Sequence, residues 1–171
     1  VCRELGVAEK EFYQAIASFT GAARRLERIA ETENIVAFRD FAHAPSKLKA
    51  TLDAVREAYA QHRLIACFEL HTYSSLNADF LGEYAHCMDA ADEAVVFFSK
   101  HTLDLKKLPL LPEESVLKAF ARADIMVTDN RDELAAHIRA QLHDATGPVC
   151  LLLMSSGTFE GIDWKNVVSH H

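Results

Sequence analysis

Short apolar runs alternate with amphipathic segments along most of this chain, and this alternation constrains the fold more than any other feature. Five runs are expected to be buried strands, at residues 35–38, 64–68, 94–98, 125–127 and 149–154. Helices are expected over residues 7–19, 46–60 and 76–91, after Pro112, and after Asn130. Strands alternating with helices indicate βαβ units. We therefore predict a doubly wound, Rossmann-like α/β fold with a mostly parallel sheet and helices on both faces.

Three of these segments carry more specific expectations. Residues 24–32 alternate loosely and are expected to form an edge strand or a hairpin with residues 35–38. Asn130 and Glu133 resemble a capping box at a helix start. The apolar side chains expected to face inward are Phe80, Tyr84 and Met88 in segment 76–91, and Val116, Leu117 and Phe120 in the helix after Pro112.

Polar side chains gather where the expected strands end. They are Asp40 and His43 after the first strand, Glu69, His71, Tyr73, Ser74 and Ser75 after the second, Ser99, Lys100 and His101 after the third, and Ser155, Ser156, Gly157 and Thr158 after the last. Ligands of open α/β sheets bind at the carboxyl ends of the strands, so this convergence predicts a site. Strand ends are also polar because loops are solvated, and Asp40 could simply cap the following helix, with His43 hydrogen-bonding nearby.

Composition narrows the class of protein. The 171 residues suffice for one full domain with an appended element. A formal net charge of −7 argues against a nucleic-acid surface. No apolar run reaches the roughly 20 residues that span a bilayer, and no signal peptide is visible, so no membrane partner is expected. Four scattered cysteines, with Cys67 and Cys150 inside apolar strands, suggest a reducing cytoplasm. The first residue, Val1, suggests an excised fragment.

Several sequence motifs of catalysis are not found. The chain has no G-x-x-x-x-G-K-[ST] loop, no G-x-G-x-x-G after a strand and no nucleophile elbow. No histidine spacing typical of a metal site occurs, so no metal ligand is predicted. Gly157 and Gly161 flank a turn that could approach a ligand, although a plain turn is the simpler interpretation. No residue is assigned as catalytic.

Three motifs in order carry a family resemblance. They are Phe19-Thr20-Gly21-Ala22-Ala23-Arg24-Arg25-Leu26-Glu27, Asp40-Phe41-Ala42-His43-Ala44-Pro45 and Phe68-Glu69-Leu70-His71-Thr72-Tyr73-Ser74. Together they resemble the linker and the C-terminal domain of the Mur ligases, ATP-dependent amide-forming enzymes of bacterial cell-wall synthesis. The resemblance covers essentially the whole chain.

The resemblance implies a domain organisation. Residues 1–21 would be the terminal helix of a preceding central ATPase domain, and residues 22–169 the Mur ligase C-terminal domain. ATP and Mg²⁺ would be the cofactors, with the phosphates and the metal held mainly by the central domain. An N-terminal domain would hold UDP-N-acetylmuramate. The protein would be cytoplasmic and bacterial, and the domain alone would be inactive.

The resemblance also implies residue roles. Arg25, Asp40 and His43 match the positions that face the nucleotide, although a solvated linker charge is the alternative for Arg25. His71, Thr72, Tyr73 and Ser74 match the turn that faces the incoming amine substrate, and Ser155 and Ser156 would border the same pocket.

Within the family, the resemblance is greatest to the murein peptide ligase branch, which acts in peptidoglycan recycling. That branch joins UDP-N-acetylmuramate to the tripeptide L-Ala-γ-D-Glu-meso-diaminopimelate through an acyl phosphate. Ala44 and Leu70 depart from a common His and a common Pro, and the turn after His71 lacks the Arg of the L-alanine-adding members. A diaminopimelate-recognition motif is not visible. A UDP-N-acetylmuramate–L-alanine ligase domain and a non-catalytic Rossmann-like binding module remain the alternatives.

Overall fold

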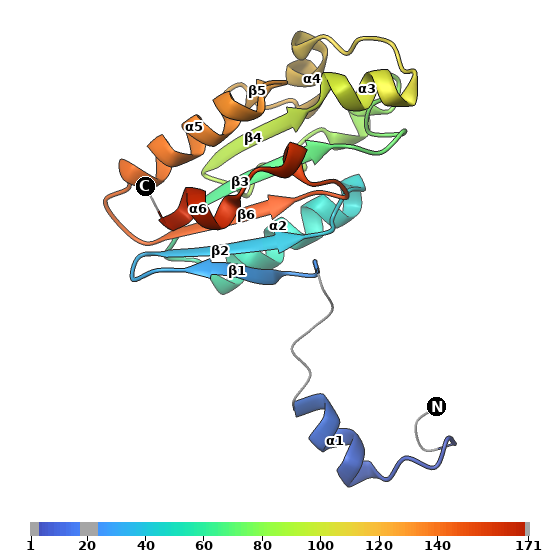
Figure 1. The fold of residues 1–171 in the computed structure, drawn as a ribbon, viewed down its shortest axis with the longest axis vertical. Helices are drawn as coiled ribbons and strands as arrows, with labels where there is room; N and C mark the ends of the chain where they lie inside the picture. Colours follow the sequence, from blue (N-terminus) through green and yellow to red (C-terminus); the bar gives the residue numbers. More distant parts are fainter. Residues whose placement is uncertain (1–3, 18–23, 170–171) are drawn as a thin grey trace.

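A computed structural model describes residues 4–17 and 24–169 (Figure 1). The elements in chain order are α1 (Glu9–Ala17), β1 (Glu27–Glu31), β2 (Ile35–Asp40), α2 (Pro45–Ala58), β3 (Arg63–Leu70), the 3₁₀ helix η1 (Leu81–Tyr84), β4 (Glu93–Phe98), α3 (Lys100–Lys106), α4 (Glu113–Phe120), β5 (Met126–Thr128), α5 (Arg131–His143), β6 (Val149–Met154), the 3₁₀ helix η2 (Phe159–Gly161) and α6 (Trp164–Ser169).

The strands form one six-stranded sheet in the order β1-β2-β6-β3-β4-β5. All neighbours are parallel except β1, which pairs antiparallel with β2 as the expected edge hairpin. Strand β6 is last in the sequence but lies between β2 and β3, where Met154 pairs with both Asp40 and Phe68. The predicted doubly wound α/β fold is confirmed, and the five parallel strands share one carboxyl edge, with β6 between β2 and β3.

Each face of the sheet has its own apolar core. Alternate strand residues such as Phe38 and Phe68 pack against α2, η1 and α4, while their neighbours Ala37 and Cys67 face α5 and α6. In Figure 1, α5 and α6 lie in front of the sheet and α2 behind it. Cys67 and Cys150 are fully buried, as expected. Burial raises the pKa of the Cys67 thiol well above its usual range. It raises the pKa of Cys150 to about 12.

Two sequence-based expectations about helices are wrong. Segment 76–91 is not a helix, because only η1 is regular there and turns flank it on both sides. Tyr84 and Met88 are nevertheless buried, so tertiary packing produced the apolar spacing. Leu117 was expected to face inward but is exposed, whereas Val116 and Phe120 are buried. Helices α3 and α6 were not expected.

Strand β3 is longer than its apolar run indicated. It extends to Leu70 and thus includes Glu69, which was expected in the loop. The end of the expected helix over residues 7–19 and the first motif as far as Ala23 lie outside the described residues. No described helix is long and apolar enough to cross a membrane.

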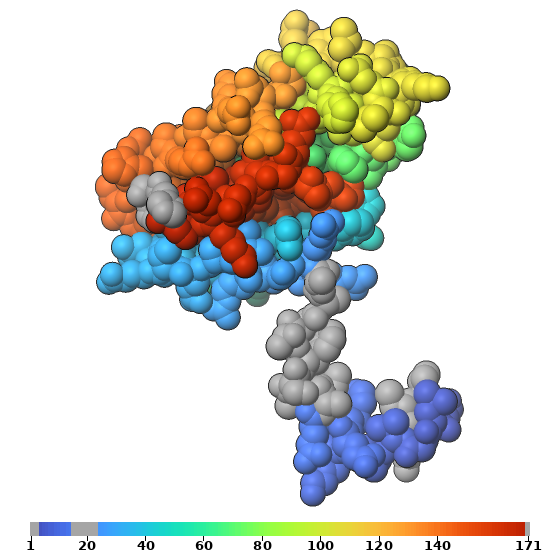
Figure 2. Space-filling model, in the orientation of Figure 1, coloured from blue at the N-terminus to red at the C-terminus, as the bar shows by residue number. Residues whose placement is uncertain are grey.

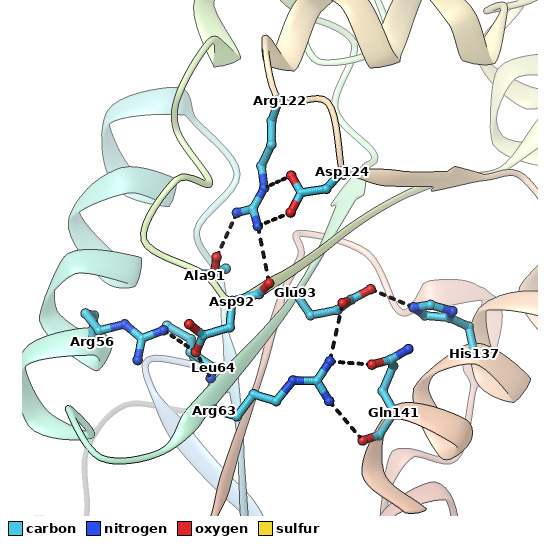
Figure 3. Close-up of polar contacts among 10 residues, drawn as sticks. All are labelled: Arg56, Arg63, Leu64, Ala91, Asp92, Glu93, Arg122, Asp124, His137 and Gln141. Atoms are coloured by element: carbon cyan, nitrogen blue, oxygen red, sulfur yellow. Dashed lines mark hydrogen bonds and ion pairs between the residues drawn. The ribbon is translucent and has the colours of Figure 1, made fainter. Parts of the chain in front are cut away.

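The amino edge of the sheet is held by arginines (Figure 3). Arg122 donates to the backbone carbonyls of Met88 and Ala91 at 2.6 and 2.8 Å and pairs with Asp124. Arg56 pairs with Asp92 at 2.6 Å, and the same carboxylate accepts the Leu64 N–H at 2.7 Å. These contacts tie the segment before β4 to α2, β3 and the turn before β5.

A second cluster joins the starts of β3 and β4 to α5. Arg63 bonds Gln141 and lies 3.4 Å from the Glu93 carboxylate, which also contacts His137 at 3.0 Å (Figure 3). The charged network therefore lies at the edge opposite the carboxyl ends of the strands. Its arginines pair with carboxylates and carbonyls of this same domain.

Candidate functional site

The carboxyl ends of β2, β6 and β3 bring most of the expected site residues to one edge. The Ser155 N–H donates to the Asp40 carbonyl at 3.0 Å, so the end of β2 is tied directly to the loop after β6. In the space-filling view, the red segment after β6 lies between the blue β1–β2 hairpin and the orange α5 (Figure 2). The site residues fall into two groups on either side of this junction.

The first group surrounds Asp40. Its two carboxylate oxygens accept the N–H groups of Leu26 and Ala42 at 2.8 and 2.7 Å. Asp40 does not cap α2, because the N-cap is Ala44 and no side chain caps that end. Pro45 is the first residue of α2. Asp40 therefore fixes the segment before β1 and the turn after β2.

A hollow of about 320 Å³ opens beside Asp40. It is lined by Arg25, Asp40, Phe41, Ala42, Lys47, Ala50 and Thr51. Within residues 4–17 and 24–169, neither Arg25 nor Lys47 forms an ion pair, and the Asp40 charge is already hydrogen-bonded. Two unpaired cations around a hollow favour an anionic ligand. Arg25 and Asp40 are thus brought together, and Lys47 joins them.

His43 belongs to the same turn but does not line the hollow. Its Nδ1 lies 2.9 Å from the Phe41 carbonyl, and its ring meets the Phe41 ring edge-on at 5.1 Å. The His43 carbonyl accepts the Tyr84 hydroxyl at 2.6 Å, which anchors the turn to the core. Burial raises the pKa of Tyr84. The local hydrogen bond foreseen as the alternative for His43 is present.

The second group is built around a buried carboxylate. Glu69 is 2% exposed and accepts hydrogen bonds from the Ser155 hydroxyl and, at 2.8 Å, from the Phe159 N–H. The Gly157 N–H donates to Ser155 Oγ at 2.6 Å. Buried charges require such partners, and here hydrogen bonds rather than a cation provide them. Glu69 therefore fixes the loop after β6 against the end of β3.

His71 lies against this loop. Its Nδ1 is 3.5 Å from Ser156 Oγ. A Cβ on Gly157 would come within 2.6 Å of His71 Cδ2 and 2.8 Å of Glu69 Oε2, which is closer than non-bonded atoms approach. Only glycine allows the backbone to pack this closely on the imidazole. His71, Ser155 and Ser156 are thus brought together as expected.

The turn after His71 is closed by its own hydroxyls. Thr72 Oγ1 and Ser75 Oγ are 2.9 Å apart, and each accepts a backbone N–H of the other residue. Ser74 Oγ lies 3.2 Å from Thr72 Oγ1. Tyr73 points outward, 62% exposed, with Lys106 Nζ 4.1 Å from its ring centroid. Thr72 and Ser74 therefore shape the turn, while Tyr73 presents an aromatic face.

The loop after β6 is also tied to the far side of the sheet. The Ser99 hydroxyl at the end of β4 donates to the Glu160 carboxylate, and Arg131 donates to the Glu160 carbonyl at 2.9 Å. Phe159 and Glu160 both have a φ of 51°, in the left-handed region. Such backbone strain persists only where surrounding contacts hold it.

Sequence reasoning missed two residues of the site and misplaced a third. Glu69 was expected in the loop after its strand, and Lys47 was a cation two residues after the proline of a helix start. Lys106 lies in the helix that was not predicted. No three His, Cys, Asp or Glu side chains in the described part of the chain gather as a metal site would require.

A comparison with protein families matches residues 24–157 to the family described as "Mur ligase, glutamate ligase domain". Among curated proteins, the chain is 36% identical over 96 residues to a UDP-N-acetylmuramate–L-alanine ligase of Solidesulfovibrio magneticus, covering 56% of this chain and 21% of that protein. It is 30% identical over 156 residues to the ligase of the same name from Porphyromonas gingivalis, covering 91% of this chain and 32% of that protein. The chain spans about a fifth to a third of the length of these relatives.

Solved structures share the fold. A murein peptide ligase from Psychrobacter arcticus superposes with a TM-score of 0.68 at 24% identity, covering 99% of this chain and 35% of that one. A crystallised domain from Haemophilus ducreyi superposes with a TM-score of 0.56 at 27% identity. Its protein is described as a candidate UDP-N-acetylmuramate:L-alanyl-γ-D-glutamyl-meso-diaminopimelate ligase. This match covers 85% of this chain and 98% of that domain.

Proposed function

Because this chain belongs to the Mur ligase family through its glutamate ligase domain, we propose that it is the C-terminal domain of an ATP-dependent amide ligase. The proposed enzyme joins UDP-N-acetylmuramate to L-Ala-γ-D-Glu-meso-diaminopimelate in peptidoglycan recycling. The muramate carboxylate is first phosphorylated by ATP, and the tripeptide amine then attacks the acyl phosphate and releases phosphate. The observation that carries the proposal is the pairing, at one sheet edge, of a cationic hollow with the His71–Ser156 group.

The proposal includes the rest of the protein. Residues 1–21 end a central ATPase domain, residues 22–169 form the C-terminal domain, and an N-terminal domain holds UDP-N-acetylmuramate. The central domain holds the nucleotide phosphates and Mg²⁺, and the metal neutralises phosphate charge when bound. The enzyme acts in the bacterial cytoplasm, and the domain alone is inactive because it supplies positioning and charge.

The hollow beside Asp40 is the proposed nucleotide side. Arg25 and Lys47 supply positive charge. Asp40 faces the ribose, since its Oδ2 accepts one hydrogen bond within the described residues, from the Leu26 N–H, and retains a second lone pair. His43 lies at the domain interface, where its turn is anchored through Tyr84.

The opposite group is the proposed amine side. It consists of His71, Thr72, Tyr73, Ser74, Ser155 and Ser156. The exposed Tyr73 with Lys106 over its ring offers an aromatic surface and a positive charge, which suit a peptide bearing several carboxylates. A single L-alanine needs no such extended surface. The second candidate, a UDP-N-acetylmuramate–L-alanine ligase, is favoured by the names of the curated relatives.

The test is phosphate release by the full-length parent protein. ATP and UDP-N-acetylmuramate are supplied with the tripeptide in one reaction and with L-alanine in another. Release with the tripeptide alone is the expected result. Release with L-alanine alone would move the chain to the second candidate, and release with neither would favour a non-catalytic binding module.

Two single variants test the nucleotide side. Arg25→Ala and Lys47→Ala should each raise the KM for ATP about tenfold, because each removes a charged contact. Lys49→Ala is the matched control, since Lys49 is on the same helix but pairs with Asp53 at 2.9 Å and does not line the hollow. Unchanged ATP kinetics in both Arg25→Ala and Lys47→Ala would contradict the assignment of this hollow.

A further inference from the structure

We infer that His71 is the general base of the ligation, a catalytic role that accepts the proton lost by the incoming amine. The inference rests on the proposed function, because it concerns the amine side of that same site. An α-amine has an ordinary pKa of about 8 and carries a proton at neutral pH, so its nitrogen has no lone pair with which to attack. A site for such a substrate needs a proton acceptor.

The imidazole of His71 is held in one orientation. It follows β3, which lies between β6 and β4 near the middle of the sheet. Gly157 lies so close to the ring that a Cβ there would come within 2.6 Å of Cδ2, and Ser156 Oγ lies 3.5 Å from Nδ1. Nε2 has no hydrogen-bond partner among the described residues. In the tautomer whose Nδ1–H points to Ser156, the free lone pair is on Nε2.

The buried Glu69 carboxylate lies close to the His71 ring. Glu69 Oε2 and His71 Cδ2 both lie within 2.8 Å of the point where a Gly157 Cβ would be, so the carboxylate and the ring share one small space. Within the described residues, Glu69 accepts hydrogen bonds from the Ser155 hydroxyl and the Phe159 N–H and pairs with no cation. Lys106 of α3 places its Nζ 4.1 Å from the centroid of the Tyr73 ring.

The other polar groups of the amine side do not suit this role. Thr72 and Ser75 bond each other, and Ser155 donates to Glu69. Hydroxyl groups accept a proton poorly at neutral pH, whereas an imidazole does so readily. Glu69 is buried and already accepts two hydrogen bonds. His71 is the remaining acceptor.

The step balances as follows. Nε2 takes a proton from R–NH₃⁺, which leaves R–NH₂ and an imidazolium. The nitrogen lone pair forms the N–C bond at the acyl phosphate carbon, and the C–O bond to phosphate breaks. The second amine proton leaves with the phosphate as HPO₄²⁻, and the imidazolium returns its proton to solvent.

The experiment compares two nucleophiles in the full-length enzyme. His71→Asn should lower kcat with the tripeptide about 10²- to 10³-fold with little change in KM, as expected for loss of a general base. Hydroxylamine is largely uncharged at neutral pH and needs no base, so its ATP-dependent conversion to the hydroxamate should fall less than about threefold. The matched control is His143→Asn, an exposed histidine at the end of α5.

Each other outcome overturns the inference. Equal losses with both nucleophiles would indicate a structural role, and a raised KM with unchanged kcat would indicate substrate contact alone. Full tripeptide activity in His71→Asn would also contradict it. If His71→Asn fails to fold by circular dichroism, His71→Gln takes its place. An inactive wild type would instead contradict the proposed function.

Discussion

At the scale of single residues, Asp40 combines a structural and a proposed binding role. Its carboxylate holds the N–H groups of Leu26 and Ala42. Asp40→Ala should therefore lower the free energy of unfolding by about 1–3 kcal/mol, because two backbone donors lose their acceptor. Urea denaturation of this chain measures the loss. Arg25→Ala is the comparison, since the exposed Arg25 should leave the stability unchanged; an equal loss in both variants would contradict this account.

Gly157 lies so close to His71 and Glu69 that no side chain fits at this position. Gly157→Ala should destabilise the chain by about 1–3 kcal/mol, because its Cβ would overlap His71 and Glu69. Gly147→Ala is a matched control, since a Cβ there meets nothing within 4 Å. Thermal denaturation distinguishes the two. A stable Gly157→Ala variant would mean that the loop after β6 shifts easily away from His71.

The place of a residue in the site was predictable where a sequence pattern marked that residue. It was not predictable where only contacts in the folded structure place the residue there. The motifs indicated Asp40 and His71, the strand-end pattern indicated Ser155, and the structure places all three at one edge. Glu69 was read as a loop residue because an acid within an apolar run looks like the end of a strand. Its partners, Ser155 and Phe159, are about 90 residues away in the sequence, so local patterns could not reveal them.

At the scale of elements, the start of α5 shows a cap that the sequence indicated only in part. Asn130 accepts the N–H groups of Asp132 and Glu133, as a capping residue does. Glu133 does not reach back to Asn130 as in a capping box; it accepts the Thr128 hydroxyl, and Thr128 Oγ1 accepts the Asn130 N–H at 3.1 Å. The box is therefore closed through the end of β5.

This arrangement predicts the cost of removing the cap. Asn130→Ala should lower the free energy of unfolding by about 1 kcal/mol. Asn130→Asp should keep most of this stabilisation, because an aspartate also caps a helix start. Chemical denaturation of the two variants and the wild type gives the comparison. Equal stability of Asn130→Ala and wild type would show that the Thr128 contact alone holds this helix start.

The strands were predictable because burial on both faces of the sheet leaves a continuous apolar run. The structure of residues 76–91 was not predictable in this way. Residues 76–91 show helical spacing, yet Tyr84 is buried through η1 and its hydroxyl bonds the His43 carbonyl. Tertiary contacts in an irregular segment can imitate helical periodicity. Helix α3 carried a usable signal in Ser99, which caps it by accepting the Thr102 N–H.

At the scale of the whole molecule, the amino ends and the carboxyl ends of the parallel strands carry different groups of residues. The amino edge holds the arginine network of Figure 3, and the carboxyl edge holds the proposed site. The sheet order was not predictable, because nothing local to β6 says that it inserts between β2 and β3. That insertion creates the site, since it brings Ser155 beside both Asp40 and Glu69.

The amino edge gives a pH prediction. Burial raises the pKa of Asp92, but the Leu64 N–H and Arg56 outweigh it, so the pKa lies below its usual range. A depressed pKa in the folded state contributes stability above the ordinary value of about 3.9 and loses it as pH falls through the lower folded pKa. Asp92→Asn should therefore lose less stability than wild type on acidification below about pH 4.

Acid denaturation followed by circular dichroism checks this prediction. Asp79→Asn is the control, because Asp79 is exposed and its carboxylate forms no ion pair within the described residues. Identical acid profiles for wild type and Asp92→Asn would contradict a stabilising role for the Arg56–Asp92 pair.

The central claim is that this domain delivers a peptide amine, rather than a free amino acid, to an activated muramate. The most direct measurement offers the full-length parent protein ATP, UDP-N-acetylmuramate and an equimolar mixture of L-alanine and L-Ala-γ-D-Glu-meso-diaminopimelate, and identifies the product by mass spectrometry. The account predicts UDP-N-acetylmuramoyl-tripeptide as the dominant product. UDP-N-acetylmuramoyl-L-alanine, or no product at all, would contradict it.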